Sequence, residues 1–133
     1  MSGGIEARAR KAAFAAMAHA YAPYSRFRVG AALVTSAGEV VTGCNVENAA
    51  YPSGICAERG AIMTAVAAGV RDFQLLVVAT EAGDPTPPCG ACRQVLVEFA
   101  RSLPIISVTA AGAEQRWNLA ELLPNPFTPD SMA

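Results

Sequence analysis

Three cysteines and one glutamate stand at spacings that are typical of a metal site. Cys56 precedes Glu58 by two residues in GICAERGAI, and Cys89 and Cys92 form a Cys-x-x-Cys pair in PPCGACRQV. Residues three apart lie on one face of a helix, so both thiolates of the pair can point the same way from its first turn. Three sulfur ligands favour zinc, and a fourth position left to water is typical of a catalytic rather than a structural zinc.

The charges around such a site indicate a reaction that moves protons. Three thiolates on a Zn²⁺ ion leave one net negative charge, which makes water on the metal less acidic than at a zinc with neutral ligands. Arg59 and the N-termini of two helices are the positive groups available to compensate. Glu58 is expected to lie beside the metal without binding it, where it can take a proton from water and give it to a substrate.

Two other interpretations of the cysteines stay open at this point. A redox pair formed by Cys89 and Cys92 would leave Cys56 and Glu58 without a role. A closed structural zinc needs a fourth ligand, for which Cys44 and His19 are the candidates, although neither stands in a second ligand pair. The simpler expectation is that both are structural, with Cys44 a small buried residue at the end of a strand.

Helical and strand patterns alternate along the chain and must position these residues. Helices are expected at residues 5–21, 56–69 and 89–101, with Pro23 after the first and Gly69 as the C-cap of the second. The expected strands are a hairpin of two runs around residues 36–38, two buried strands at 73–80 and 104–110, and a short strand at 114–119. This order predicts an α/β fold, with helices on both faces of a mixed sheet.

Composition limits the organisation of the protein and its partners. The 133 residues fit one domain, residues 1–133, with a core at about 5–123 and a proline-punctuated tail at 124–133. Hydrophobic residues make up 53% of the chain and charged residues 16%, which leaves few charges to cover a lone domain and favours a homo-oligomer. A net charge of -1 argues against a nucleic-acid partner and for a neutral small substrate.

The sequence also predicts where the protein resides. No apolar run approaches the roughly 20 residues of a membrane span, so no membrane partner is expected. The N-terminal stretch MSGGIEARARKAAF lacks the apolar core of a signal peptide. We therefore expect a cytoplasmic protein, in which cysteines stay reduced and available to a metal.

The cysteine pattern resembles the zinc deaminase signature, in which Cys or His followed by Ala-Glu precedes Pro-Cys-x-x-Cys. The fuller pattern is similar to the small cytidine deaminase family. The matching stretches are YSRFRVGAAL at 24–33, GCNVENAAYPSGICAER at 43–59, PCGACRQVL at 88–96 and LLPNPF at 122–127. The resemblance implies a three-layer αβα sandwich with a mixed five-stranded sheet, one zinc ion per chain and a homotetramer whose active sites are shared between subunits. The activity it implies belongs to pyrimidine salvage: hydrolytic deamination of cytidine and 2′-deoxycytidine to uridine and 2′-deoxyuridine, with release of ammonia.

The resemblance also implies roles for individual residues. The ligands would be Cys56, Cys89 and Cys92, the proton shuttle Glu58, and the arginine that bonds the thiolates Arg59. The implied substrate contacts are Asn45 and Glu47 to the ribose 3′-hydroxyl, Phe27 beside the pyrimidine, backbone contacts from Ala57 to the base, and Tyr51 and Phe127 from neighbouring subunits. An amide and a carboxylate two residues apart on an extended segment suit a hydroxyl, which both donates and accepts. Without the resemblance, this stretch is equally well a polar turn and Phe27 a core residue.

Two departures from the family pattern and two rival functions remain. Ser53 stands where relatives often have an apolar residue, and Gly60 stands where they often have threonine. A glycine there costs about 1 kcal/mol of helix stability relative to alanine.

Blasticidin-type deaminases share the zinc motifs, although CNVEN and LLPNPF favour the nucleoside enzyme. A zinc-stabilised binding module would instead need four protein ligands. Arg93, Gln94 and Arg101 receive no role.

Overall fold

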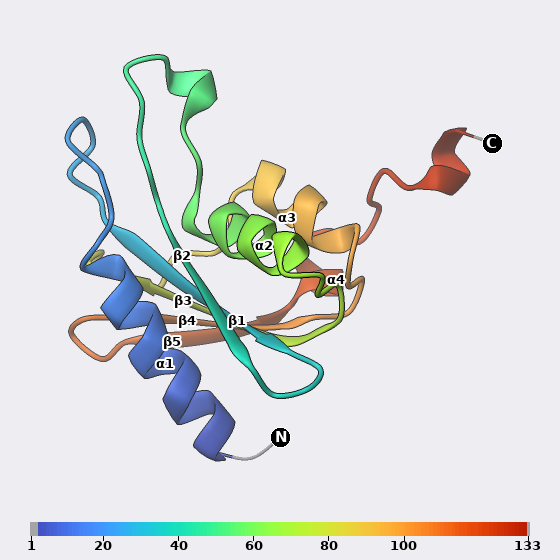
Figure 1. The fold of residues 1–133 in the computed structure, drawn as a ribbon, viewed down its shortest axis with the longest axis horizontal. Helices are drawn as coiled ribbons and strands as arrows, with labels where there is room; N and C mark the ends of the chain where they lie inside the picture. Colours follow the sequence, from blue (N-terminus) through green and yellow to red (C-terminus); the bar gives the residue numbers. More distant parts are fainter. Residues whose placement is uncertain (1–2, 133) are drawn as a thin grey trace.

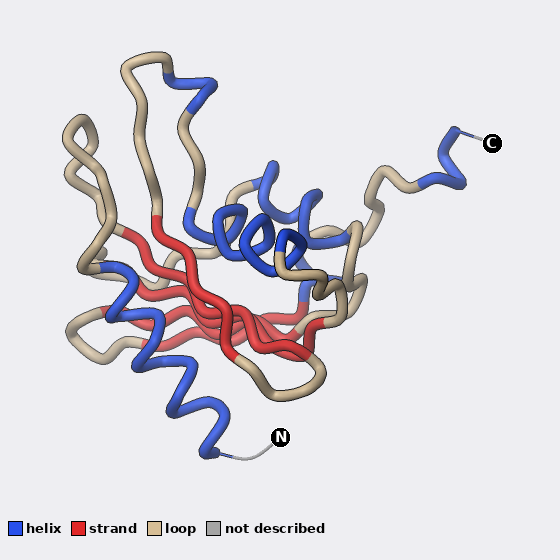
Figure 2. Tube along the Cα trace, in the orientation of Figure 1, coloured by secondary structure: helices blue, strands red, loops and turns tan. Residues whose placement is uncertain are grey.

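The computed structural model of the chain describes residues 3–132 and consists of one five-stranded sheet between two layers of helices (Figure 1). The elements in chain order are α1 (Gly3–Met17), β1 (Val29–Thr35), β2 (Val40–Cys44), a 3₁₀ turn (Tyr51–Ser53), α2 (Ala57–Ala67), β3 (Phe73–Thr80), α3 (Gly90–Val97), β4 (Pro104–Thr109), β5 (Glu114–Asn118), α4 (Leu119–Leu122) and a second 3₁₀ turn (Pro129–Met132). Figure 2 shows the strands gathered in the middle, with helix on either side. The predicted α/β fold with a mixed sheet is confirmed.

The sheet has the order β2-β1-β3-β4-β5. All neighbouring strands are antiparallel except β3 and β4, which run parallel because α3 carries the chain back between them. Helix α1 covers one face, and α2 and α3 lie together on the other (Figure 1). The N-termini of α2 and α3, where the cysteines stand, are thereby brought to one side of the sheet.

Alternation along the central strands builds both layers of the core. In β1, Leu33 packs in the cluster under α2 and α3, whereas Val34 packs in the cluster under α1. Strand β3 divides in the same way, with Leu76 on one side and Leu75 on the other, each 1% exposed or less. A strand buried on both faces reads as a continuous apolar run, which explains FQLLVVAT at 73–80.

Two helices are shorter than their patterns predict. Helix α1 ends at Met17 because Tyr21 leaves the helical path and pairs with the segment after β2: its N–H donates to Asn45 O at 2.9 Å, and its carbonyl accepts from Glu47 N at 2.8 Å. Helix α3 ends at Val97. Long-range pairing of this kind is invisible to local helical periodicity.

Strand β2 and helix α2 approach each other closely at Gly43. A Cβ atom built there would lie 2.4 Å from both Ala57 O and Ala61 N, so no larger residue fits without displacing the helix. On the facing helix, a Cβ at Gly60 would meet nothing nearer than Cys44 O, at 3.6 Å. Lack of space therefore does not explain why glycine, and not a larger residue, stands at position 60.

Alanine substitutions at these two glycines are expected to act in opposite directions. Gly43→Ala should lower the free energy of unfolding by about 3 kcal/mol, because the methyl group overpacks a backbone-to-backbone contact. Gly60→Ala should raise it by about 0.5–1 kcal/mol, because alanine loses less conformational entropy in a helix. Urea denaturation of both variants at one protein concentration measures this, and a destabilised Gly60→Ala protein would contradict the contact geometry.

Within the described residues, no helix is both long enough and apolar enough to cross a membrane.

Candidate metal centre

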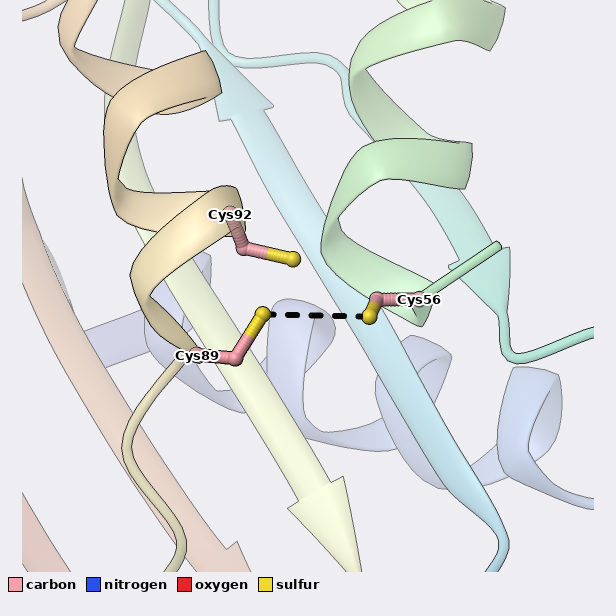
Figure 3. Close-up of side chains that lie close together, drawn as sticks. All are labelled: Cys56, Cys89 and Cys92. Atoms are coloured by element: carbon pink, nitrogen blue, oxygen red, sulfur yellow. Dashed lines mark hydrogen bonds between the residues drawn. The ribbon is translucent and has the colours of Figure 1, made fainter. Parts of the chain in front are cut away.

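The three cysteines of the sequence motif converge from the starts of two helices. Cys56 is the N-cap of α2, Cys89 is the N-cap of α3, and Cys92 stands in the first turn of α3. Their sulfur atoms face one another across the gap between the helices (Figure 3). All three lie within 4.8 Å of one another, and the Sγ atoms of Cys56 and Cys89 are 3.9 Å apart.

These distances fit a tetrahedral zinc site. Zinc–thiolate bonds of about 2.3 Å at tetrahedral angles put two sulfur atoms about 3.8 Å apart. Among residues 3–132, the group of metal-competent side chains holds these three cysteines and no fourth His, Cys, Asp or Glu. His19 and Cys44 stand outside it, His19 exposed and Cys44 only partly buried. The donor set is therefore that of an open, three-ligand site.

Mutual hydrogen bonding already prepares one of the sulfurs for a cation. The hydrogen bond with the Cys92 thiol lowers the pKa of Cys56 to about 6, with further help from Cys89 and the charge of Arg59 and against the effect of burial. The pKa of Cys92 moves upward, because its thiol hydrogen-bonds to Cys56 and is buried. A Zn²⁺ ion would replace these shared protons and favour all three thiolates.

Glu58 lies in the first turn of α2 with only 6% of its surface exposed. Burial raises its pKa to about 7, the charge of Cys56 adds to the rise, and a hydrogen bond with its own backbone opposes it. A carboxyl group that gains and loses a proton near neutral pH is suited to act as both base and acid.

A pocket of about 190 Å³ opens beside the cysteines and Glu58. Its lining residues are Phe27, Val29, Asn45, Cys56, Ala57, Glu58, Val78, Thr86, Pro87 and Cys89. Six of these ten were expected from the sequence. The others, Val29, Val78, Thr86 and Pro87, were not, although Thr86 and Pro87 shortly precede the ligand candidate Cys89.

Asn45 and Glu47 use much of their hydrogen-bonding capacity on the segment between α1 and β1. Asn45 accepts from Val29 N at 2.9 Å and donates to Phe27 O at 2.8 Å. One oxygen of Glu47 accepts from the backbone N–H groups of Tyr24 and Ser25, at 3.0 and 3.1 Å, and the other accepts from the Ser25 hydroxyl. Both side chains therefore shape the segment that carries Phe27.

Glu47 does not line the cysteine pocket itself. It lines a neighbouring hollow of about 240 Å³ with Tyr24, Ser25, Asn48, Tyr51 and Gly54. Another hollow, also of about 240 Å³, includes both Glu47 and Cys56 in its lining, together with Asn45 and Tyr51. This second hollow thus shares lining residues both with the cysteine pocket and with the first hollow.

Tyr51 and Phe127 are not brought into the cysteine pocket within one chain. Tyr51 is 77% exposed on the projecting segment between β2 and α2, and its ring meets Tyr24 edge-on with centroids 6.4 Å apart. Phe127 is 59% exposed on a C-terminal segment that extends away from the sheet (Figure 1).

Two helix residues without an assigned role turn out to fix the chain around the site. Gln94 donates to Phe127 O at 2.7 Å and accepts from Phe127 N at 3.3 Å. Arg93 donates to Pro88 O at 2.8 Å and to Leu122 O at 3.0 Å, which ties the approach to Cys89 to the end of α4. The signal in the sequence was their position immediately after the Cys-x-x-Cys pair.

Comparison with known proteins gives a consistent result. Residues 5–107 match the family described as the cytidine and deoxycytidylate deaminase zinc-binding region. The cytidine deaminase of Sporosarcina psychrophila is 44% identical over 115 residues, which cover 86% of this chain and 85% of that protein. That of Halalkalibacterium halodurans is 43% identical over 123 residues, covering 92% and 93%. The crystal structure of cytidine deaminase from Burkholderia pseudomallei matches with a TM-score of 0.89 at 45% identity, covering 96% of this chain and 100% of that one.

Proposed function

This chain belongs to the cytidine and deoxycytidylate deaminase family, and we propose that it hydrolyses cytidine and 2′-deoxycytidine to uridine and 2′-deoxyuridine, with release of ammonia, in pyrimidine salvage. The observation that carries this proposal is the buried Glu58 beside three converging thiols, two of which, Cys56 and Cys89, line one pocket with it. An acid–base group next to an open metal site is what addition of water and loss of an amine require.

Cys56, Cys89 and Cys92 would hold one zinc ion per chain, which supplies the Lewis acidity that makes water nucleophilic near neutral pH. Glu58 accepts a proton from the water that attacks C4 of the pyrimidine, and delivers it to N3. It then takes the second proton from the hydroxyl group now on C4 and transfers it to the exocyclic nitrogen, so that the C4 carbonyl forms as the bond from C4 to that nitrogen breaks and ammonia leaves. The raised pKa of Glu58 supports this double role.

The remaining pocket residues orient the nucleoside. Phe27 and Val29 offer an apolar wall for the pyrimidine ring, and Ala57 presents its backbone beside the acid–base group. Asn45 and Glu47 would bind the ribose 3′-hydroxyl with the hydrogen-bonding capacity that the segment around Phe27 leaves free. The positive charge of Arg59 would offset the thiolates, as it already does at Cys56.

The exposed aromatic rings support an assembly in which subunits complete one another's sites. Tyr51 and Phe127 would enter the pockets of neighbouring subunits in a homotetramer, which also accounts for the high apolar content of the chain. Within this proposal, residues 1–133 form one catalytic unit in the cytoplasm. Its four free cysteines fit a reducing compartment.

The decisive experiment follows the near-ultraviolet absorbance of cytosine when purified protein is mixed with cytidine, with and without a zinc chelator. Loss of absorbance with release of ammonia, stopped by the chelator and restored by zinc, is the expected result. Turnover of an aminopyrimidine antibiotic but not of cytidine would instead indicate a blasticidin-type deaminase. Bound zinc without turnover of either substrate would indicate a binding module.

A further inference from the structure

Phe27 is held by its backbone from both sides. Its N–H donates to the Ser25 hydroxyl oxygen at 3.0 Å, and its carbonyl accepts from the Asn45 side chain at 2.8 Å. Asn45 follows directly on β2, whereas Ser25 belongs to the same irregular segment as Phe27 itself. Ser25 is thus a local support for the pocket-lining aromatic residue, and the sequence motif gave it no role.

The Ser25 hydroxyl connects Phe27 to a charge. The hydroxyl has one proton, and the Glu47 carboxylate can only accept, so Ser25 donates to Glu47 and keeps its own oxygen free for Phe27 N–H. The same hydrogen bond is the main cause that lowers the pKa of Glu47, because it stabilises the ionised carboxylate. Position 25 therefore requires a side chain in which one atom both donates and accepts a hydrogen bond, and the alanine side chain has no such atom.

The turn spanned by this pair has an unfavourable backbone. Arg26, between Ser25 and Phe27, has φ of 59°, in the left-handed region that non-glycine residues rarely adopt. Such a conformation persists where the surroundings enforce it. The hydrogen bond across Arg26, together with those that Ser25 donates to Glu47, supplies that enforcement.

Glu47 can serve the turn and a ligand at once. Its Oε1 accepts from Tyr24 N and Ser25 N, and its Oε2 accepts from the Ser25 hydroxyl, which leaves one acceptor position on Oε2. A ribose hydroxyl bound there would share its acceptor atom with Ser25. Base and sugar binding would then both depend on the Ser25 hydroxyl.

We propose that Ser25 is a positioning residue for nucleoside binding: it links the Glu47 carboxylate to the backbone of Phe27 and so sets the orientation of the Phe27 ring in the pocket. This proposal rests on the proposed function. Ser25 itself does not line the cysteine pocket, and it acts through Phe27 and Glu47. Because neither residue exchanges protons with the pyrimidine in the proposed mechanism, a loss at Ser25 should appear in binding more than in turnover.

The test compares Ser25→Ala and Ser25→Thr with Ser102→Ala. Ser102→Ala is the control because Ser102 is exposed, its hydroxyl bonds to Asn118 Oδ1, and it does not line the pocket. Ser25→Ala is expected to raise KM for cytidine about tenfold and to weaken uridine binding, measured by calorimetry, to a similar extent, because a hydrogen bond to a charged group is lost. The value of kcat should change less than about threefold, since the proton-transfer groups are intact. Ser25→Thr, which keeps the hydroxyl, should restore both constants.

The outcomes separate this inference from the proposed function. Equal KM and uridine affinity in Ser25→Ala and Ser102→Ala would overturn the role of Ser25. So would a loss confined to kcat, or a loss in Ser25→Thr as large as in Ser25→Ala. Wild-type protein that binds uridine but leaves cytidine unchanged would overturn the proposed function. The role of Ser25 would then be decided by the uridine affinities of the variants alone. Wild-type protein that neither binds uridine nor converts cytidine would overturn both the proposed function and the role of Ser25.

Discussion

Replacing Glu58 with glutamine is expected to lower kcat for cytidine by about 10²- to 10⁴-fold, the usual contribution of a general acid–base group. Glutamine has nearly the same shape, so it fits the site in which Glu58 is 6% exposed. Its amide cannot take a proton from water and return it to the pyrimidine. Initial rates with cytidine, together with zinc content by atomic absorption, measure the effect and show whether the metal stays bound.

A matched control for this variant is Glu39→Gln. Glu39 is an exposed residue next to the β1–β2 turn, away from the pocket. Its substitution makes the same change from a carboxyl group to an amide as Glu58→Gln but should leave kcat and KM unchanged. Glu58→Gln protein that stays within about tenfold of wild type would show that this carboxyl is not the proton shuttle.

Replacing Cys89 with alanine is expected to abolish zinc binding and, with it, measurable turnover. Cys89 is the best cysteine for this experiment because it is exposed, whereas Cys92 is fully buried. Loss of the Cys89 side chain therefore removes few packing contacts, so the change in the free energy of unfolding reflects mainly the loss of the metal. Zinc present at about 1,000 times its Kd stabilises a folded protein by about 4 kcal/mol, which the variant should lack.

Cys44→Ala provides the comparison for the metal experiment. Cys44 is a free cysteine on β2 that stands outside the three-sulfur group. The Cys44→Ala protein should keep one zinc per chain and near-normal activity. If Cys89→Ala also kept one zinc per chain, another side chain would have to act as ligand, and the three-cysteine assignment would be wrong.

The regular elements were predictable because their signals are local. The run 73–80 is a strand from its first residue to its last, as predicted. Gly69 follows α2 with φ of 85°, and Val70 N donates to Ala65 O at 2.9 Å, the capping geometry that its position after an apolar helix predicts. Hydrophobic periodicity and capping glycines act within a few residues, so one sequence displays them fully.

The cysteine cluster was predictable for another reason. Two cysteines three apart, with a third before Ala-Glu, restrict the chemistry so strongly that spacing alone suggested convergence on one ion. The sulfur positions of Cys56, Cys89 and Cys92 now provide the three-ligand group that this required. Their roles as ligands, and that of Glu58 as shuttle, remain predictions for the experiments above.

The hydrogen bonds that build the rest of the site could not be predicted. Ser25 bonds to Glu47 across 22 residues, and Gln94 bonds to Phe127 across 33. No local pattern records such pairs, because each depends on how the sheet brings distant loops together. The early end of α1 has the same origin, since Tyr21 pairs with residues that follow β2.

The placement of ligand candidates on two helices has a consequence for cooperativity. Cys56 begins α2, and Cys89 and Cys92 begin α3, so a bound ion would join two helices that the intervening β3 separates in the chain. Opening of either helix would then break metal–sulfur bonds, and the two should exchange their amide hydrogens as a single unit. Without the ion, we expect the amide hydrogens of α2 and α3 to exchange at more separate rates, because only the packing of the shared core then couples the two helices.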